Sequence, residues 1–323
     1  MAILTTLSLD EAVSVGSAYG VAVERVRGIK AGSVNSNYEL GLSGGKRLFL
    51  RIYEEQTPGT AASEAALLAH LVARGVPTPE PLVLRVGGPG AFISIHRGKP
   101  VALFPWIDGK SLCQREVEAH HTFEIGVALA RLHLAGSDFQ KPLLNRFGID
   151  RLKERLSTIL RAEVSQELRT TAGDLRGTLD EVEHRRMGDG GLIHGDLFRD
   201  NVLWNDRNIG ALLDFESASQ GDFAFDLAVS LLAWCFRDNL SLDLAQAMVR
   251  GYESVRTLTS ADRASLFDAT RAAAVRFSIT RITDFELRKE IVGVYKDYRR
   301  FVLRLEVVEQ LGPARFAAAL GIG

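Results

Sequence analysis

Alternating apolar residues predict a β-sheet in the first third of the chain. Two alternating runs flank the glycine pair at 44–45: Tyr38, Leu40 and Leu42 precede it, and Leu48, Leu50 and Ile52 follow it. A period of two describes strands with one buried face, and paired glycines favour a tight turn between them. We expect a helix over 61–74 and two further short strands near 92–96 and 101–104.

The periodicity becomes helical after the segment 104–109, which reads FPWIDG. Helices are expected over 117–135, 148–168, 172–186, 242–255, 260–287 and 289–311. A chain of 323 residues is long enough for two lobes that share a cleft. The patterns therefore predict an α+β fold with a β-rich lobe at 1–103, a hinge at 104–109 and a helical lobe at 110–323.

A second hairpin pattern interrupts the helical part at 192–214. Two short apolar runs, 202–204 and 209–213, enclose the polar turn Asn205-Asp-Arg-Asn208. Pairing Trp204 with Ile209 returns the chain so that Asp214 lies beside residues 199–201, because paired strands are only about 4.8 Å apart. The next helix is apolar nearly all round and carries Asp226 at its start, where this acid either caps the helix or holds the preceding loop.

Composition limits the classes of partner. The chain has 46% hydrophobic residues, 24% charged residues and a net charge of −1, which gives no basic field for nucleic acid or for an anionic membrane. The two cysteines form no CxxC pair, so a disulfide or a zinc site is not expected. The longest apolar run is too short to span a bilayer, and the N-terminus does not read as a signal peptide. We expect a cytoplasmic monomer or homodimer.

The hairpin segment also carries the strongest chemical signal. His194, Asp196 and Asn201 form the pattern H-x-D-x-x-x-x-N, and Asp214-Phe-Glu216 follows the hairpin. This spacing is that of the catalytic loop and metal motif of kinases. Asp196 would accept the proton of a substrate hydroxyl, and Asn201 and Asp214 would supply oxygen ligands to Mg²⁺. The alternative is that these residues are ordinary turn formers.

Further candidates lie in the β-rich part. The stretch 30–37 reads as a loop of small and polar residues that could present N–H groups to phosphates, or as an ordinary polar turn. Arg51 is expected on the face opposite Leu50, either at the position of the phosphate-pairing kinase lysine or in solvent, and Glu64 is its possible partner. In the hinge, Trp106 is either a stacking partner for adenine or a core aromatic. The nucleotide-binding candidates are Gly32, Ser33, Asn35, Ser36, Asn37, Arg51, Phe104 and Trp106.

These motifs resemble those of the aminoglycoside phosphotransferase and choline kinase superfamily, and within it the type II homoserine kinases. The resemblance covers about 29–285 and is most specific in HGDLFRDNVL, which begins at His194. It implies a protein-kinase-like bilobal fold, the cofactors ATP and Mg²⁺, and phosphorylation of the hydroxyl of L-homoserine. Arg276 and Arg281 are candidate partners of a substrate carboxylate, because a guanidinium matches it bidentately. Arg199 is a third candidate, either for that carboxylate or for the phosphates.

Other acceptors and other classes stay open at this point. The same superfamily phosphorylates sugars, choline-like alcohols, hydroxylysine and aminoglycosides. A pseudokinase that binds ATP without turnover is the alternative that is not an enzyme. The candidate base and metal acid are both present, which favours an enzyme acting on a small-molecule hydroxyl.

Overall fold

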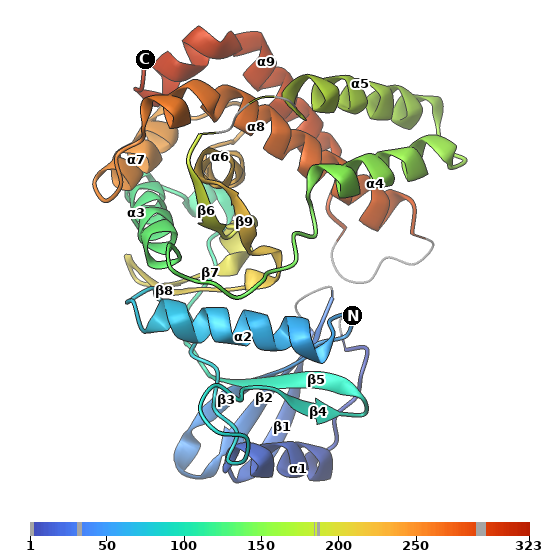
Figure 1. Cartoon of the computed structure of the whole chain (residues 1–323), viewed down its shortest axis with the longest axis vertical. Helices are drawn as coiled ribbons and strands as arrows, with labels where there is room; N and C mark the ends of the chain where they lie inside the picture. The colour runs from blue at the N-terminus through green and yellow to red at the C-terminus, as the bar shows by residue number, and fades with distance from the viewer. Residues whose placement is uncertain (1–2, 31–33, 184, 186–187, 289–294) are drawn as a thin grey trace.

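A computed structural model describes residues 3–30, 34–183, 185, 188–288 and 295–323, and in it a β-sheet part precedes a helical part (Figure 1). The sheet has five antiparallel strands in the order β1-β2-β3-β5-β4. Its strands are β1 Val23–Ile29, β2 Ser36–Leu42, β3 Arg47–Ile52, β4 Ser94–His96 and β5 Lys99–Pro105. The predicted hairpin is confirmed as β2 and β3, in which Leu40 pairs with Leu48.

The two helices of the sheet part lie on opposite faces of the sheet (Figure 1). α1 Leu9–Tyr19 begins with the capping box of Ser8 and Glu11, and its apolar side packs with Leu40, Leu50 and Ile52 in one core. α2 Pro58–Val72 joins the larger core of the helical part instead. Since α2 starts at Pro58 after the Thr57 cap, the expected start at 61 was too late.

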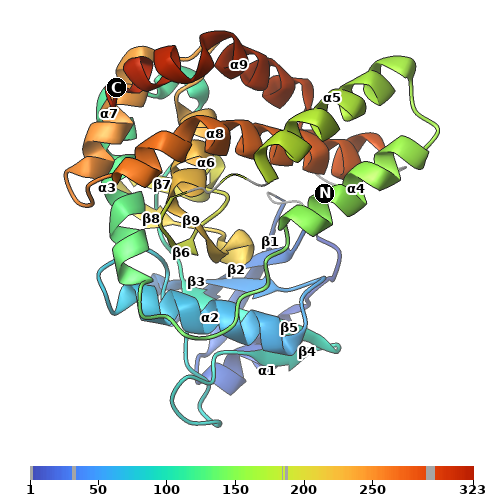
Figure 2. The same cartoon turned by 45° about the horizontal axis from the view of Figure 1, so that its top comes forward.

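The helical part consists of α3 to α9 with two small strand pairs inserted. Its helices are α3 Ala119–Ala135, α4 Ile149–Arg161, α5 Gln166–Glu183, α6 Phe223–Trp234, α7 Leu242–Glu253, α8 Ser260–Arg281 and α9 Arg299–Leu320. The strands are β6 Gly190–Ile193 with β9 Ser219–Asp222, and β7 Val202–Asn205 with β8 Asn208–Leu212. In both views α4 and α5 project together from one side of the molecule (Figure 2).

The hairpin β7–β8 connects the two parts. Trp204 pairs with Ile209 as predicted, and the Leu213 N–H donates to the Asn201 carbonyl at 2.8 Å, so Asp214 follows directly beside the loop. The Leu212 N–H donates to the Pro77 carbonyl at 2.6 Å, which attaches the hairpin to the chain after α2. Trp204 is buried in the larger core.

Several predicted boundaries differ from the structure. The helix expected at 148–168 ends at Arg161, and a helix expected from 289 begins only at Arg299. The carboxylate of Asp297, one residue before the N-cap Tyr298, accepts the Arg299 N–H at 2.9 Å at this late start. Residues 289–294 lie outside the described residues. β5 runs on to Pro105, so the first two residues of the expected hinge belong to a strand.

Within the described ranges no helix has the length and apolar character needed to cross a membrane.

Candidate active site

The loop 194–201 is held from behind by Asp226. One carboxylate oxygen accepts the His194 N–H and the other accepts the Gly195 N–H, both at 2.7 Å. Gly195 has a φ of +72°, and a Cβ there would lie 3.0 Å from the Ser217 carbonyl oxygen, so glycine is required at this position. Of the two interpretations offered for Asp226, the structure supports the one in which it holds the loop, because α6 is preceded by Asp222 at its N-cap.

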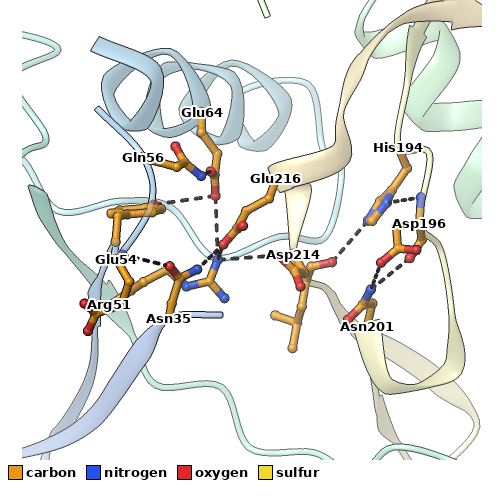
Figure 3. A network of polar contacts seen from close by, with 12 residues as sticks. Asn35, Arg51, Glu54, Gln56, Glu64, His194, Asp196, Asn201, Asp214 and Glu216 are labelled. Carbon is orange, nitrogen blue, oxygen red and sulfur yellow. Dashed lines mark hydrogen bonds and ion pairs between the residues drawn. The ribbon is translucent and has the colours of Figure 1, made fainter. Parts of the chain in front are cut away.

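The imidazole of His194 links the two acidic segments. Nε2 donates to the Leu213 carbonyl at 3.1 Å, and Nδ1 accepts the Asp196 N–H at 3.3 Å. Burial lowers the pKa of His194, which keeps the ring neutral and suited to one donated and one accepted bond. This ring therefore sets the spacing between Asp196 and Asp214 (Figure 3).

Asp196 and Asn201 lie next to each other at the two ends of the loop. The amide nitrogen of Asn201 donates to the Asp196 backbone carbonyl at 2.8 Å and to its carboxylate at 3.3 Å. Burial raises the pKa of Asp196 to about 7, against the opposing effect of the Arg276 charge. Because the amide nitrogen of Asn201 faces Asp196, its amide oxygen is the atom left for another partner.

Arg51 lies in the cleft among three carboxylates, so its interpretation as a solvated strand residue is wrong. Its Nη1 is 3.4 Å from Glu216, 3.6 Å from Asp214 and 3.7 Å from Glu64 (Figure 3). The possible pair of Arg51 with Glu64 is therefore present. Burial, partly offset by the Arg51 charge, raises the pKa of Glu64 to about 7. Asp214 has a φ of +65°, and its Oδ1 is buried without a hydrogen-bond partner among the described residues.

A cavity of about 330 Å³ adjoins these charges between the sheet and the hairpin. Phe104 and Trp106 line it, as does Leu203 from the hairpin, and Arg51 with Asp214 forms its polar end. A cavity that is apolar at one end and charged at the other can hold a nucleotide, with its nucleobase in the apolar part and its phosphates at the charged end. The cavity is lined by Ile29, Phe49, Arg51, Glu64, Leu68, Thr78, Pro79, Phe104, Pro105, Trp106, Ile107, Gly109, Leu203, Leu213, Asp214 and Phe215.

The segment 34–37 is only partly the loop that was expected. Ser36 and Asn37 belong to β2, and the Ser36 hydroxyl accepts N–H groups of the N-terminal segment, from Leu4 at 2.8 Å and Thr5 at 2.9 Å. Ser36 is therefore occupied within the sheet, which corrects its expected role beside phosphates. Asn37 pairs with Arg51 across β2 and β3 and shares its face. Gly32 and Ser33 lie outside the described residues.

A second cavity, of about 180 Å³, opens beside Asp196. Arg276 and Arg281 both line it, together with Arg288 and Lys296, whereas its acids are Asp196 and Asp284. The Arg276 guanidinium is buried between Phe147 and Phe277, at 4.1 and 4.3 Å from the ring centroids, and donates to the Gly195 carbonyl. Arg276 and Arg281, predicted as partners of a substrate carboxylate, therefore lie in one cavity with Asp196. The sequence did not indicate that Phe147 and Phe277 would hold the Arg276 guanidinium between their rings.

Arg199 lies apart from this cavity. Its guanidinium donates to the Ala233 carbonyl near the end of α6, and burial lowers its pKa. Glu216 and Arg146 belong to the site, although neither was assigned a role from sequence. Arg146 lies in the segment between α3 and α4, where no apolar period marks it, and its Nη1 is 3.2 Å from the Glu216 carboxylate.

The fold and the two adjoining cavities define a kinase-like bilobal protein. Solved structures with the same fold include the amicoumacin kinase hAmiN (TM-score 0.69, 16% identity, 95% of this chain and 94% of that one) and the choline kinase of Cryptosporidium parvum (TM-score 0.65, 16% identity, 92% and 93%). At such identity the likeness concerns the fold alone.

Sequence comparison supplies the family. The chain matches the Phosphotransferase enzyme family over residues 25–264. Its relatives include the homoserine kinases of Granulibacter bethesdensis (34% identity, 88% of this chain and 89% of that one) and Rhizobium etli (33%, 97% and 98%). The chain belongs to the phosphotransferase enzyme family, and the expected ATP-dependent phosphotransferase is confirmed.

Proposed function

We propose that this chain transfers the γ-phosphoryl group of ATP to the hydroxyl of L-homoserine. The observation that carries the proposal is the position of Asp196: it lines a cationic cavity, and its loop partner Asn201 accepts the N–H of Leu213, which lines the other cavity beside Asp214. A base between a nucleotide site and an acceptor site is the arrangement that phosphoryl transfer needs. The similarity to homoserine kinases over most of the chain supports this acceptor.

Asp196 is the proposed base. It would accept the proton of the acceptor hydroxyl as the oxygen attacks the γ-phosphorus, and a base with a pKa near 7 is matched to that task. Asn201 holds the Asp196 carboxylate in place through its amide nitrogen. Arg276, stacked between two rings, partly balances the charge of Asp196 without forming an ion pair with it.

The residues present fit a bound Mg²⁺. The buried Oδ1 of Asp214 has no hydrogen-bond partner in the part of the chain that the structure describes, and the amide oxygen of Asn201 is left free by the amide nitrogen that faces Asp196, so both offer hard oxygen ligands. When bound, the ion would neutralise charge on the β- and γ-phosphates. The proposed phosphate contacts are Arg51, Gly32, Ser33, Asn35 and Asn37. Phe104 and Trp106, at the proposed hinge 104–109 between lobes 1–103 and 110–323, would contact the adenine.

The acceptor cavity favours an anionic group on the acceptor. Among the described residues four basic side chains and two acidic ones line it; Asp284 is already paired with Arg155 at 2.8 Å, and Lys296 with Asp200 at 3.3 Å. A carboxylate would meet Arg276 and Arg281, whereas a polycationic aminoglycoside would meet an excess of like charge. Arg199, bound to a backbone carbonyl elsewhere, is the weaker candidate.

An ADP-release assay tests the proposal across L-homoserine, L-serine, L-threonine, hydroxylysine, choline, N-acetylhexosamines and kanamycin. We expect L-homoserine to give the highest kcat/KM. Arg276→Gln should raise KM for it by about tenfold, the effect of losing roughly 1.4 kcal/mol of binding, whereas Arg199→Gln should leave that KM within about twofold. Preference for an acceptor without a carboxylate would reject the homoserine assignment. ATP binding without turnover on any acceptor would instead indicate a pseudokinase.

A further inference from the structure

We propose that Glu216 is a positioning residue that couples the nucleotide cavity to the acceptor cavity, so that each ligand strengthens binding of the other. The inference rests on the proposed function, because it takes one cavity as the nucleotide site and the other as the acceptor site. Glu216 lies between them: its neighbour Phe215 lines the first cavity and its neighbour Ser217 lines the second.

On the nucleotide side Glu216 contacts Arg51 and Asn35. Oε1 is 3.4 Å from the Arg51 Nη1 and also accepts a hydrogen bond from the Asn35 amide nitrogen (Figure 3). Arg51 in turn lies 3.6 Å from Asp214 at the polar end of the nucleotide cavity. One carboxylate oxygen thus connects the strand β3 with the end of the segment that precedes β2.

On the acceptor side the other oxygen of Glu216 holds Arg146. The Nη1 of Arg146 donates to Oε2 at 3.2 Å. The next residue, Phe147, lines the acceptor cavity and lies 4.1 Å from the Arg276 guanidinium carbon. Val34, which precedes Asn35, lines the same cavity. Within the described residues Glu216 thus contacts Asn35 and Arg146 besides Arg51, and each of these two is the chain neighbour of a residue that lines the acceptor cavity.

Charge provides the physical means of coupling. The Glu216 side chain is only 10% exposed, and its carboxylate shares Arg51 with Asp214 and Glu64. Triphosphate oxygens would attract Arg51 and weaken its contact with Glu216. A buried carboxylate needs its remaining partners, so Glu216 would then hold Asn35 and Arg146 more firmly. Phe147 would be fixed against Arg276, which prepares the acceptor cavity before the acceptor binds.

Titration calorimetry with L-homoserine, in the presence and absence of AMP-PNP and Mg²⁺, tests the coupling. The unmodified chain should bind L-homoserine at least about fivefold more tightly with the nucleotide, the lower end of ordinary coupling between sites. Glu216→Gln, which keeps the size but removes the charge, should reduce this factor to below about twofold. Arg146→Met removes the acceptor-side contact of Glu216, and with it the pair with Glu55, but keeps the contacts of Glu216 with Arg51 and Asn35; it should reduce the factor in the same way.

Glu55→Gln is the matched control. Glu55 also pairs with Arg146, at 3.6 Å, but its side chain is 55% exposed and it contacts Nη2, whereas Glu216 contacts Nη1. This variant should retain the coupling factor. A melting temperature for each variant without ligands serves as a second measurement. If Glu216→Gln unfolds, the coupling factor of Arg146→Met alone tests the proposal. Arg146 is a partly exposed surface residue, so its substitution should leave the chain folded.

Three results would overturn the proposal: independent binding of the two ligands in the unmodified chain, coupling retained in Arg146→Met, or a Glu216→Gln defect confined to a higher Mg²⁺ requirement. The last would make Glu216 a metal ligand. Failure of the homoserine assignment is distinguishable, because L-homoserine would then show no turnover. Coupling would in that case be measured with the acceptor of highest kcat/KM.

Discussion

Asp226 accepts the backbone N–H of His194 at 2.7 Å, across 32 positions of sequence. The same carboxylate accepts Gly195 N–H with its other oxygen and a hydrogen bond from His133 at 3.0 Å. Burial is the largest single influence on Asp226 and opposes its ionisation, but the contacts with His133 and His194 together outweigh burial and lower the pKa. His133 of α3 is buried and therefore supports, through Asp226, the loop that carries Asp196.

Asp226→Asn should lower both stability and turnover. The substituted NH₂ group would face a backbone N–H that now lacks an acceptor, which costs about 1–3 kcal/mol. We expect urea unfolding to show a loss in that range and kcat for the best acceptor to fall by at least tenfold. Asp222→Asn makes the same change at the α6 N-cap, where the side chain makes no capping hydrogen bond within the described residues, and should lose far less of both. Equal effects of the two variants would refute the role given to Asp226.

The local part of the site could be predicted because its geometry follows from neighbouring residues. The alternation in β2 and β3 set the register, and the turn formers at 205–208 returned Asp214 beside Asn201. Short polar loops between such strands leave few arrangements. The place of Asp226 was foreseen only as one of two alternatives, because an acid near a helix start serves equally well as a cap.

The rest depends on contacts that no short pattern encodes. Arg51 contacts Glu64 from α2 and Glu216 from the segment after β8, because these two segments meet beside β3. The alternation in β3 predicts only that Arg51 lies on the face opposite Leu50. Arg146 reaches Glu216 from a segment without periodicity. Arg199 was placed near Asp196 by sequence distance, yet the turn at 199–201 directs it to Ala233.

Gly126→Ala should destabilise the helical part strongly. A Cβ at Gly126 in α3 would lie 2.1 Å from the Met248 carbonyl oxygen of α7, so the two backbones could not keep their approach. Overpacking of this kind costs about 1–3 kcal/mol or more, which exceeds the roughly 1 kcal/mol that alanine gains in helix propensity. Gly173→Ala in α5 meets nothing within 4 Å and should raise stability slightly. Chemical denaturation measures both, and a stabilised Gly126→Ala would contradict the close contact of α3 and α7.

Removal of either proposed metal ligand should affect turnover differently. Asp214→Ala deletes a charged ligand and should abolish turnover at all Mg²⁺ concentrations. Asn201→Ala deletes a neutral ligand and should lower kcat by about 10²-fold or more, with partial recovery as Mg²⁺ is raised. Initial rates against Mg²⁺ concentration distinguish the two. Normal turnover of either variant at low Mg²⁺ would contradict the metal site.

Asp196→Asn should lower kcat by roughly 10²–10⁴-fold without destabilising the chain. Burial raises the folded-state pKa of Asp196 from its ordinary value of 3.8 to about 7. The folded chain therefore holds this proton more tightly than the unfolded chain, and ionisation of Asp196 reduces stability as pH rises between these values. Relative to the unmodified chain, the variant should gain stability from about pH 4 to pH 7 and show no further gain above it. Urea unfolding across that range gives the difference.

The pH dependence of kcat/KM should report Asp196 directly. The base must be ionised to accept the hydroxyl proton, so kcat/KM should rise with pH through an apparent pKa near 7. The Arg276 charge favours ionised Asp196 and opposes the effect of burial. Arg276→Gln should therefore move this acidic limb to higher pH, in addition to its effect on KM. Arg315→Gln removes an exposed arginine whose guanidinium donates to the Leu311 and Gln310 carbonyls of its own helix, and should leave the limb in place. A limb that stays unmoved in Arg276→Gln would mean that the titrating group is not Asp196.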